Sequence, residues 1–480
     1  MNTRGRRRSA PKLVAPLVIV AVALCVSACG GDDDVGGDGG VPDARAGDAA
    51  GTDAAGLPDS GVPPRDGGGG TDAGPGPSLG CAPLAPSGGT EVRVTPDRAD
   101  ELVGLVRDAA PGTTFVLEDG TYRFSGGDEG SRRLQIRAAG VTLRSASDDA
   151  ERVILDGEYQ TEEMVFITAS NVTLAHLTLT HAVNHPVHVT PPSGGPNVTG
   201  VLLYGLRIID GGEQFVKINS NGDRSGFVDD GRIECSFFQL TDAGRPRVER
   251  CCGGCYTGGV DAHYSRGWVV RNNRFEDIYC AGEGLAEHAV HFWSASRDTL
   301  VENNTIVRCA RGIGFGLVRD GNTRSYADDP YPGVGYIGHY DGIIRNNVIY
   351  ADHPYFDTGI ELDQARGARV YHNTVYSTAG ATGFFSSIDY RFENTDVDVR
   401  NNITRRITNR DGAGGRVENN LEDAAPALFV DASGLDFHLA PGATAAIDQG
   451  VTVPEAGVDI DGDSHDLGAA PDLGADERRP

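Results

Sequence analysis

Lys217 is the residue whose type and context first point to chemistry in this sequence of 480 residues. The chain contains two lysines, and the other, Lys12, lies in a basic segment at the N-terminus. Arginine supplies every other permanent cation, so a retained lysine favours a task that arginine performs poorly, such as that of a general base. The alternative is a single exposed lysine without such a task.

Five short segments share an alternation of apolar and polar residues, and the first of them contains Lys217. They are residues 214–218, 259–263, 289–293, 312–316 and 359–363. Because side chains alternate across a strand, an inward apolar set leaves the polar set pointing outward. The outward residues are Lys217, Asp261, His263, His291, Glu361 and Asp363. If the strands stack about 4.8 Å apart, the lysine and both histidines lie within roughly 10 Å of one another on one face. The alternative for the histidines is a hydrogen-bonded, structural role.

Glycines and aromatic residues beside these positions are typical of a binding surface. Trp293 ends the third segment, and Gly314 and Gly316 lie in the fourth, where backbone without side chains would form a flat patch for a ligand. An insertion follows, and its ring-bearing residues are Tyr326, Tyr331, Tyr336, His339 and Tyr340. We expect either a lid whose rings stack on sugars or a solvated surface loop. The pattern predicts a groove for an extended chain.

A repeated phrase must position these segments, and it reads apolar, any, Asn or His, Asn, any, apolar. Clear copies occupy residues 270–275, 301–306, 344–349 and 370–375, and weaker copies occupy 233–238, 399–404 and 417–420. Short apolar pieces of period two at variable spacing indicate a solenoid of β-strand coils that stack on one another. Asn tolerates positive φ at a sharp bend, and its amide can bond the Asn of the next coil. We therefore assign the Asn pairs to architecture, with a binding site as the alternative.

The composition agrees with a turn-rich β fold. The chain has 67 Gly, 2 Met and 7% aromatic residues, which argues against helical repeats. A net charge of −26 excludes nucleic acid as a partner, and an acidic sugar needs local cations to approach. Residues 97–110 predict one short helix that ends at Pro111 and Gly112, and residues 114–122 predict the first strand.

Two parts of the sequence resemble a known family. The run ELVGLVRDAAPGTTFVLEDGTYRF, with VTLRSA, VILDG and NVTLAHLTLT after it, resembles the first coils of the pectate-lyase superfamily, especially its chondroitinase-B and alginate-lyase-like branch. The runs FVDASGLDFHLAPGATAAIDQG and DIDGDSHDLGAAPDLGADE resemble the tail of many secreted β-helix proteins. The resemblance implies an all-β, right-handed parallel β-helix with a short N-terminal capping helix over residues 81–440, followed by a tail over 441–480.

The same resemblance implies an enzyme that cuts an extracellular polysaccharide at a uronic acid by β-elimination. It implies a lysine base, an arginine partner and bound calcium. We assign the base to Lys217 and the arginine partner to Arg311, and we add His263 and His291 to the catalytic group. The calcium ligands would be Asp261, Glu361 and Asp363. One alternative is a non-catalytic protein that binds glycan or cell-wall material. Another is a glycoside hydrolase, because two carboxylates two residues apart on one strand lie about 6.5 to 7 Å apart.

The N-terminus predicts export and a lipid anchor. Residues 1–29 combine a basic head, an apolar run too short to span a bilayer, and small residues before Cys29, which resembles a bacterial lipoprotein signal. The alternative is a plain secretory signal. Residues 30–80 are almost wholly Gly, Asp, Ala and Pro, so we expect a disordered tether. We expect a monomer held to the outer membrane or cell surface by its lipid only.

Seven cysteines remain after Cys25 and Cys29 are set aside, and an exported protein favours disulfides among them. The cluster within residues 251–255 predicts a stapled loop, with zinc bound by Cys252, Cys255 and His263 as the alternative. An odd count leaves one free thiol. In the tail, residues 459–466 space carboxylates as calcium loops do, but lack the closing bidentate Glu, so a structural turn is favoured over a calcium site.

Overall fold

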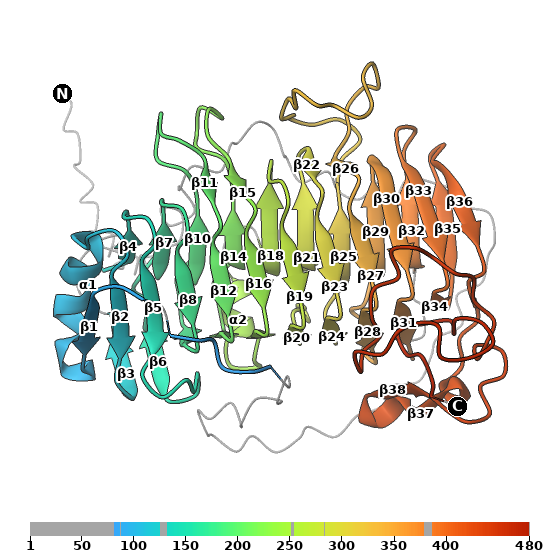
Figure 1. Ribbon diagram of the computed structural model, residues 1–480, viewed down its shortest axis with the longest axis horizontal. Coiled ribbons are helices and arrows are strands. Elements are labelled where there is room, and N and C mark those ends of the chain that lie inside the picture. The colour runs from blue at the N-terminus through green and yellow to red at the C-terminus, as the bar shows by residue number, and fades with distance from the viewer. Residues whose placement is uncertain are drawn as a thin grey trace, which may run out of the picture.

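The chain folds into a long right-handed parallel β-helix, seen side-on in the computed structural model (Figure 1). The structure describes residues 81–86, 88–124, 132–250, 254–282, 284–378 and 386–479. The predicted signal, Cys29 and the predicted tether lie outside these residues. Three parallel sheets, here named A, B and C, run along the helix axis, and each coil contributes one strand to each sheet. The predicted fold class is confirmed.

Sheets A and B form two sides of the helix. Sheet A contains β1 (Glu91–Val94), β2 (Thr114–Leu117), β5 (Thr142–Ser145), β8 (Thr173–Ala175), β12 (Leu202–Tyr204), β16 (Arg232–Glu234), β19 (Val269–Arg271), β23 (Leu300–Glu302), β27 (Ile343–Arg345), β30 (Ala365–Tyr371), β33 (Asp396–Arg400) and β36 (Gly414–Glu418), with β22 (Ser296–Arg297) and β26 (His339–Tyr340) at its side. Sheet B contains β3 (Gly120–Arg123), β6 (Val153–Asp156), β9 (Thr178–Thr180), β13 (Arg207–Ile209), β17 (Phe237–Gln239), β20 (Arg274–Glu276), β24 (Thr305–Val307), β28 (Val348–Ala351), β31 (Thr374–Ser377) and β34 (Ile403–Thr404).

Sheet C forms the third side and carries the five segments aligned from the sequence. It contains β4 (Leu134–Ile136), β7 (Val165–Ile167), β10 (Val187–Val189), β14 (Gln214–Ile218), β18 (Gly258–His263), β21 (His288–Trp293), β25 (Arg311–Phe315), β29 (Thr358–Asp363), β32 (Ser386–Arg391) and β35 (Ile407–Arg410). Two short pairs stand apart: β11 (Val198–Thr199) with β15 (Val228–Asp229), and β37 (Phe429–Asp431) with β38 (Asp436–Leu439).

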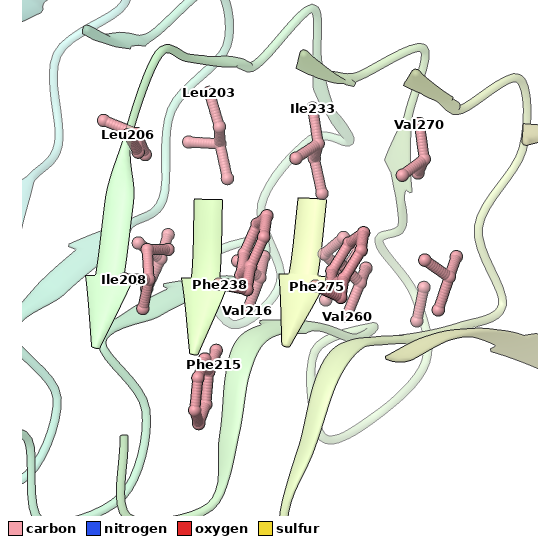
Figure 2. Packing of buried hydrophobic residues seen from close by; sticks show 14 of the residues in the cluster. Leu203, Leu206, Ile208, Phe215, Val216, Ile233, Phe238, Val260, Val270 and Phe275 are labelled. Carbon is pink, nitrogen blue, oxygen red and sulfur yellow. The ribbon is translucent and has the colours of Figure 1, made fainter. Parts of the chain in front are cut away.

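The core consists of apolar side chains stacked in rows from coil to coil. In sheet A, Leu203, Ile233 and Val270 occupy matching positions of adjacent strands and are fully buried. Figure 2 shows this row beside the rings of Phe238 and Phe275, whose centroids are 4.4 Å apart in a stacked arrangement. Each coil therefore buries its apolar side chains against its neighbours, as expected for a solenoid.

The Asn pairs divide two tasks between their members. The first residue of each pair takes positive φ, for example 54° at Asn303 and 55° at Asn346. The second residue points inward and forms a ladder, in which Asn304 N donates to Asn347 Oδ1 at 3.0 Å and Asn347 N donates to Asn373 Oδ1 at 3.1 Å. Both tasks that the sequence assigned to these residues are present, on different members of each pair.

A short helix caps the N-terminal end of the solenoid. A 3-10 turn (Pro96–Arg98) leads into α1 (Ala99–Arg107), which buries Leu102 and Val106. This agrees with the predicted capping helix. Strand β1 precedes the helix and was not predicted, because its four residues, EVRV, are too few to show a periodicity.

The tail packs on the row of positive-φ residues. Asn346 donates to the carbonyls of Ala456 and Val458, and Asn401 donates to the carbonyl of Val451 at 2.7 Å. Asp459 Oδ1 accepts from the backbone N–H groups of residues 461 and 463, which is the structural turn favoured from the sequence. The tail thereby covers the bends of the last coils.

Disulfides join distant parts of the chain. Cys81 pairs with Cys235, 154 residues away, and Cys255 pairs with Cys280 across the loop predicted to be stapled. The disulfide at Cys255 rules out the zinc site that included it. Cys309 is free and buried among the described residues, and two cysteines of the loop lie outside them.

The remaining helical segments are short. A second helix, α2 (Arg245–Val248), has four residues, and two further 3-10 turns (Pro426–Leu428 and Ala432–Gly434) lie near the C-terminus. Among the described residues, no helix is both long and apolar enough to cross a membrane.

Candidate active site

The outer face of sheet C carries a row of mostly polar residues on seven consecutive strands, from β10 to β32. The strand register aligns His188, Lys217, Asp261, His291, Gly314, Glu361 and Asp389 in that order. The alternating apolar residues, such as Val216 and Ile218, face the core and are fully buried. The outward register read from the sequence is therefore the observed one.

The row differs from the prediction in its exposure. Lys217 is 2% exposed and Asp261 is 4% exposed, so neither is a free surface charge. A charge buried in this way needs partners, since taking an ion out of water costs several kcal/mol. The alternative reading of Lys217 as a lone exposed lysine is wrong.

Asp261 is the centre of a cluster of five residues on β14, β18 and β21. Its Oδ2 accepts from Lys217 Nζ at 2.9 Å and lies 3.1 Å from His263 Nε2. Its Oδ1 accepts from Trp293 Nε1 at 2.8 Å and lies 3.7 Å from His291 Nδ1. The structure thus brings together four predicted residues around a fifth, which the sequence had assigned to calcium.

The electrostatics of this cluster set the proton positions. Burial opposes ionisation, but Lys217, His263 and His291 lower the pKa of Asp261 well below its ordinary value of 3.8. An ionised Asp261 holds Lys217 as an ammonium and accepts the N–H of His263 Nε2. His263 Nδ1 is then left as an acceptor, 3.5 Å from the hydroxyl of Ser294. Lys217 therefore provides a positive charge in this state. The lone pair on Nδ1 of neutral His263 is what a general base requires.

Glu361 and Asp363 form a second cluster on β29, farther along the row. Glu361 Oε2 accepts from His288 Nε2 at 3.0 Å, and Arg391 Nη2 lies 3.5 Å from its Oε1. Asp363 accepts from Arg391 Nε at 2.9 Å and is fully buried. The predicted acid pair therefore shares one arginine.

The two carboxyl groups titrate in opposite directions. For Glu361 burial opposes ionisation, yet Arg311, the hydrogen bond from His288 and Arg391 lower its pKa. For Asp363, burial and the charge of Glu361 raise the pKa well above 3.8. Two carboxyl groups on one strand with pKa values shifted in opposite directions are the pattern found in acid and base pairs.

The three residues predicted to bind calcium do not fit that ion. Calcium takes six to eight oxygen ligands. Asp261, Glu361 and Asp363 each bond a lysine, histidine or arginine instead, and Asp261 is separated from the other two by the strands β21 and β25. We derive no step through calcium.

Arg311 does not lie beside Lys217. It belongs to β25, three strands from β14 in the order of sheet C, which corresponds to roughly 14 Å along the axis. Its Nε lies 3.4 Å from Asp357 Oδ2. Arg311 therefore does not provide the arginine partner that the resemblance implies for Lys217 at one sugar unit, because three coils separate the two residues.

Gly314 and Gly316 do not form an open floor. A Cβ at Gly314 would lie 2.7 Å from His288 Nε2, so the imidazole occupies the place above this glycine. Gly316 has φ of 72° and its carbonyl accepts from His291 Nε2 at 3.0 Å. Both glycines serve the packing of histidines and a turn.

The predicted lid residues also have structural roles. His339 is fully buried, stacks on Phe315 at 3.9 Å, and bonds the Asp341 carbonyl and the Thr299 hydroxyl. Tyr340 belongs to β26 and packs with rings of the insertion. The backbone carbonyl of Tyr336 accepts from Asn394. The aromatic residues of the insertion pack against one another and against the side of sheet A. The sequence left a lid and a solvated surface loop as alternatives, and stacking of these rings on sugars stays a prediction.

Two residues that could take part in chemistry were given no role from the sequence. Glu287 and His288 come together with His291, and one ligand atom from each lies within 4.8 Å of the others. The spacing of His288 and His291, three residues, places them on opposite faces of a regular strand, so strict alternation gives His288 no place in the outward row. Their rings are 4.4 Å apart on the same side. The letters EH-x-x-H were the available signal.

Comparisons with known proteins give similarity of architecture at low identity. No protein-family profile and no curated protein matches the sequence. One similar solved structure is a pectate lyase, which is 14% identical, covers 82% of this chain and 97% of its own chain, and has a TM-score of 0.47. Another is an alginate lyase from a Paenibacillus species, which is 15% identical, covers 69% of this chain and 99% of its own chain, and has a TM-score of 0.43. A lacto-N-biosidase from Eubacterium ramulus is 11% identical, covers 70% of this chain and 68% of its own chain, and has a TM-score of 0.45. The strand pairing itself establishes that the chain is a parallel β-helix.

Proposed function

We propose that this chain acts on an extracellular polysaccharide along the outer face of sheet C and cleaves it at a uronic acid by β-elimination. The observation that carries the proposal is the cluster of Lys217, His263 and Trp293 around Asp261. A buried ion pair stabilises a fold less than apolar packing of the same volume. Such a cluster outside the apolar core therefore favours a function over a structural role.

Each member of the cluster has a role in this reaction. His263, oriented by Asp261, takes the C5 proton through Nδ1. The C4–O bond breaks as the C4=C5 double bond forms, and the leaving oxygen takes a proton from the imidazolium so formed or from water. Lys217 remains protonated and its ammonium neutralises the carboxylate of the uronic acid as charge develops. Trp293, half-buried at the edge of the cluster, offers an aromatic surface to a sugar ring. This assignment moves the base from Lys217 to His263, because Asp261 stabilises the charged form of the lysine.

A panel of uronic-acid polysaccharides incubated with the purified chain tests the reaction, with the ultraviolet absorbance of an unsaturated uronide as readout. His263→Gln should lower the rate by about two orders of magnitude, consistent with loss of a general base. The matched control is His181→Gln, which alters another histidine bonded to a carboxylate, at 2.8 Å from Asp156 and away from sheet C. Equal rates for both variants would reject the role of His263.

Hydrolysis is the second candidate, favoured by the opposite pKa shifts of Glu361 and Asp363. In this reaction the protonated Asp363 would serve as acid and Glu361 as the ionised partner. The products separate the candidates, since hydrolysis creates reducing ends without an unsaturated uronide. Binding of glycan without either product would support a non-catalytic binding protein.

The proposed location is outside the cell, with a lipid on Cys29 as the only membrane attachment and the chain acting as a monomer. The support is the lipoprotein-like signal and the polar run that follows it. Cys29→Ser should release the protein from the membrane fraction and remove acyl mass from its N-terminus. Wild-type protein that is already free of acyl mass would contradict the anchor.

A further inference from the structure

Three metal-ligating side chains meet on the outer side of β21. Glu287 directly precedes the strand, and His288 and His291 belong to it. One ligand atom from each of the three residues lies within 4.8 Å of the other two. Two imidazoles and one carboxylate form a ligand set that suits divalent transition metals such as zinc.

The hydrogen bonds of the two rings leave the same nitrogen available on each. His291 Nε2 lies 3.0 Å from the carbonyl oxygen of Gly316, which can only accept, so Nε2 carries the hydrogen. His288 Nε2 donates in the same way to the carboxylate of Glu361 at 3.0 Å. In a neutral imidazole the lone pair is then on Nδ1. Metal-binding histidines typically donate their other N–H to a carboxylate or a carbonyl, as both rings do here.

His288 Nδ1 has no explained purpose in the fold. His288 is 1% exposed, and its Nδ1 is buried without a hydrogen-bond partner among the residues that the structure describes. Buried polar atoms are rarely left in this state, because each one loses its bonds to water. An ion bound at Nδ1 would satisfy this atom.

The remaining ligands surround the same point. His291 Nδ1 lies 3.9 Å from Glu287 Oε2, beyond hydrogen-bond length, whereas two ligands of one zinc ion are roughly 3.3 Å apart. The Glu287 side chain is 24% exposed, so it can close this gap by rotation and also gives the ion a path from solvent. Asp261 Oδ1, at 3.7 Å from His291 Nδ1, places a second carboxylate beside the site.

We propose that Glu287, His288 and His291 bind one divalent transition-metal ion, of the zinc type. The site differs from a calcium site in its nitrogen ligands. It goes beyond the proposed cleavage reaction and does not depend on it, because binding of the ion is measurable without any polysaccharide. Gly314 belongs to the site as the glycine that leaves room for the His288 ring.

The test is metal binding by the purified chain after treatment with a chelator, followed by titration with Zn²⁺ in a calorimeter and with Co²⁺ in a visible spectrometer. Two other groups among the described residues could also take an ion, one of His438, Asp461 and Asp476 and one of Asp459, Asp461 and Asp463. Every protein in the series therefore carries His438→Gln and Asp461→Asn, because Asp461 belongs to both groups. We expect one ion per chain and a Co²⁺ spectrum of a site with nitrogen ligands. Absence of binding in this background would overturn the proposal.

Two variants and two controls locate the ion. Glu287→Gln, at a partly exposed position, and His291→Gln should each weaken binding by about tenfold or more, which is the effect expected on removal of a group that serves a metal site. Glu393→Gln, an exposed glutamate paired with Arg319, and His339→Gln, a fully buried histidine with both nitrogens bonded, should leave it unchanged. Unchanged binding in Glu287→Gln would overturn the assignment even if His291→Gln fails to fold.

Discussion

Replacement of Asp261 by Asn tests how the candidate site is held together. The substitution keeps the shape of the side chain and removes its charge, while Lys217 Nζ stays buried beside the new amide, where Oδ2 had accepted its bond at 2.9 Å. Breaking a buried ion pair by removing one partner costs about 3 to 5 kcal/mol, against about 0 to 1 kcal/mol for an exposed pair. We expect Asp261→Asn to lower the free energy of unfolding by about 3 kcal/mol or more.

The effect should depend on pH in a defined direction. The folded state lowers the pKa of Asp261 below 3.8, so the unfolded chain binds a proton more readily than the folded chain does. Ionised Asp261 therefore adds stability above its ordinary pKa, and this contribution is lost as the pH falls below about 4 toward the folded-state pKa. The difference between wild type and Asp261→Asn should be complete at pH 7 and smaller in acid.

Chemical denaturation of wild type, Asp261→Asn, Lys217→Met and the double variant measures this coupling. The double variant should be more stable than the sum of the two single losses predicts, because neither charge is then buried without its partner. Asp320→Asn, at an exposed position of the insertion, is the control and should change stability by less than about 0.5 kcal/mol. A loss below about 1 kcal/mol in Asp261→Asn at pH 7 would refute the buried ion pair.

Two further predictions concern the solenoid. Asn347→Ala removes hydrogen bonds to Asn304 and Asn373 and should lower the free energy of unfolding by about 2 to 4 kcal/mol. The control Asn409→Ala, at an exposed position, should lower it little, and equal losses in the two variants would contradict the ladder. Replacing the cysteines of the Cys81 disulfide by serine should lower the free energy of unfolding by about 2 to 5 kcal/mol. The same change at the Cys255 disulfide should lower it less, because the first disulfide closes a loop of 154 residues and the second one of 25. The reverse order would contradict this reasoning.

The fold could be predicted because it repeats. Each coil carries its own alternation and its own Asn pair, so errors at one coil do not affect the others, and the inward row that contains Val216 follows directly. Strand β1 and the docking of the tail at Asn346 and Asn401 could not be predicted. They depend on single contacts between distant segments, and such contacts leave no period in the sequence.

The sequence was enough to predict the sheet face on which the candidate site lies, but not the contacts that its side chains make. Alternation placed Lys217 and His291 outward, yet burial depends on loops whose course no local pattern reveals. Alternation gives His288 no place beside His291, because an odd spacing means opposite faces on a regular strand, whereas the two rings lie on the same side here. Arg311 was assigned as the partner of Lys217 by the resemblance alone. It lies beside the fourth of the five aligned segments and Lys217 lies in the first, which separates them by three coils.

Formation of an unsaturated uronide by the purified chain is the measurement that bears most directly on the proposed function. Wild type should produce it from at least one uronic-acid polysaccharide, and both His263→Gln and Asp261→Asn should reduce the rate by about two orders of magnitude at a temperature where each variant is folded. His181→Gln should cleave like wild type. Reducing ends without the uronide, or full activity in His263→Gln, would contradict cleavage by β-elimination at the Asp261 cluster.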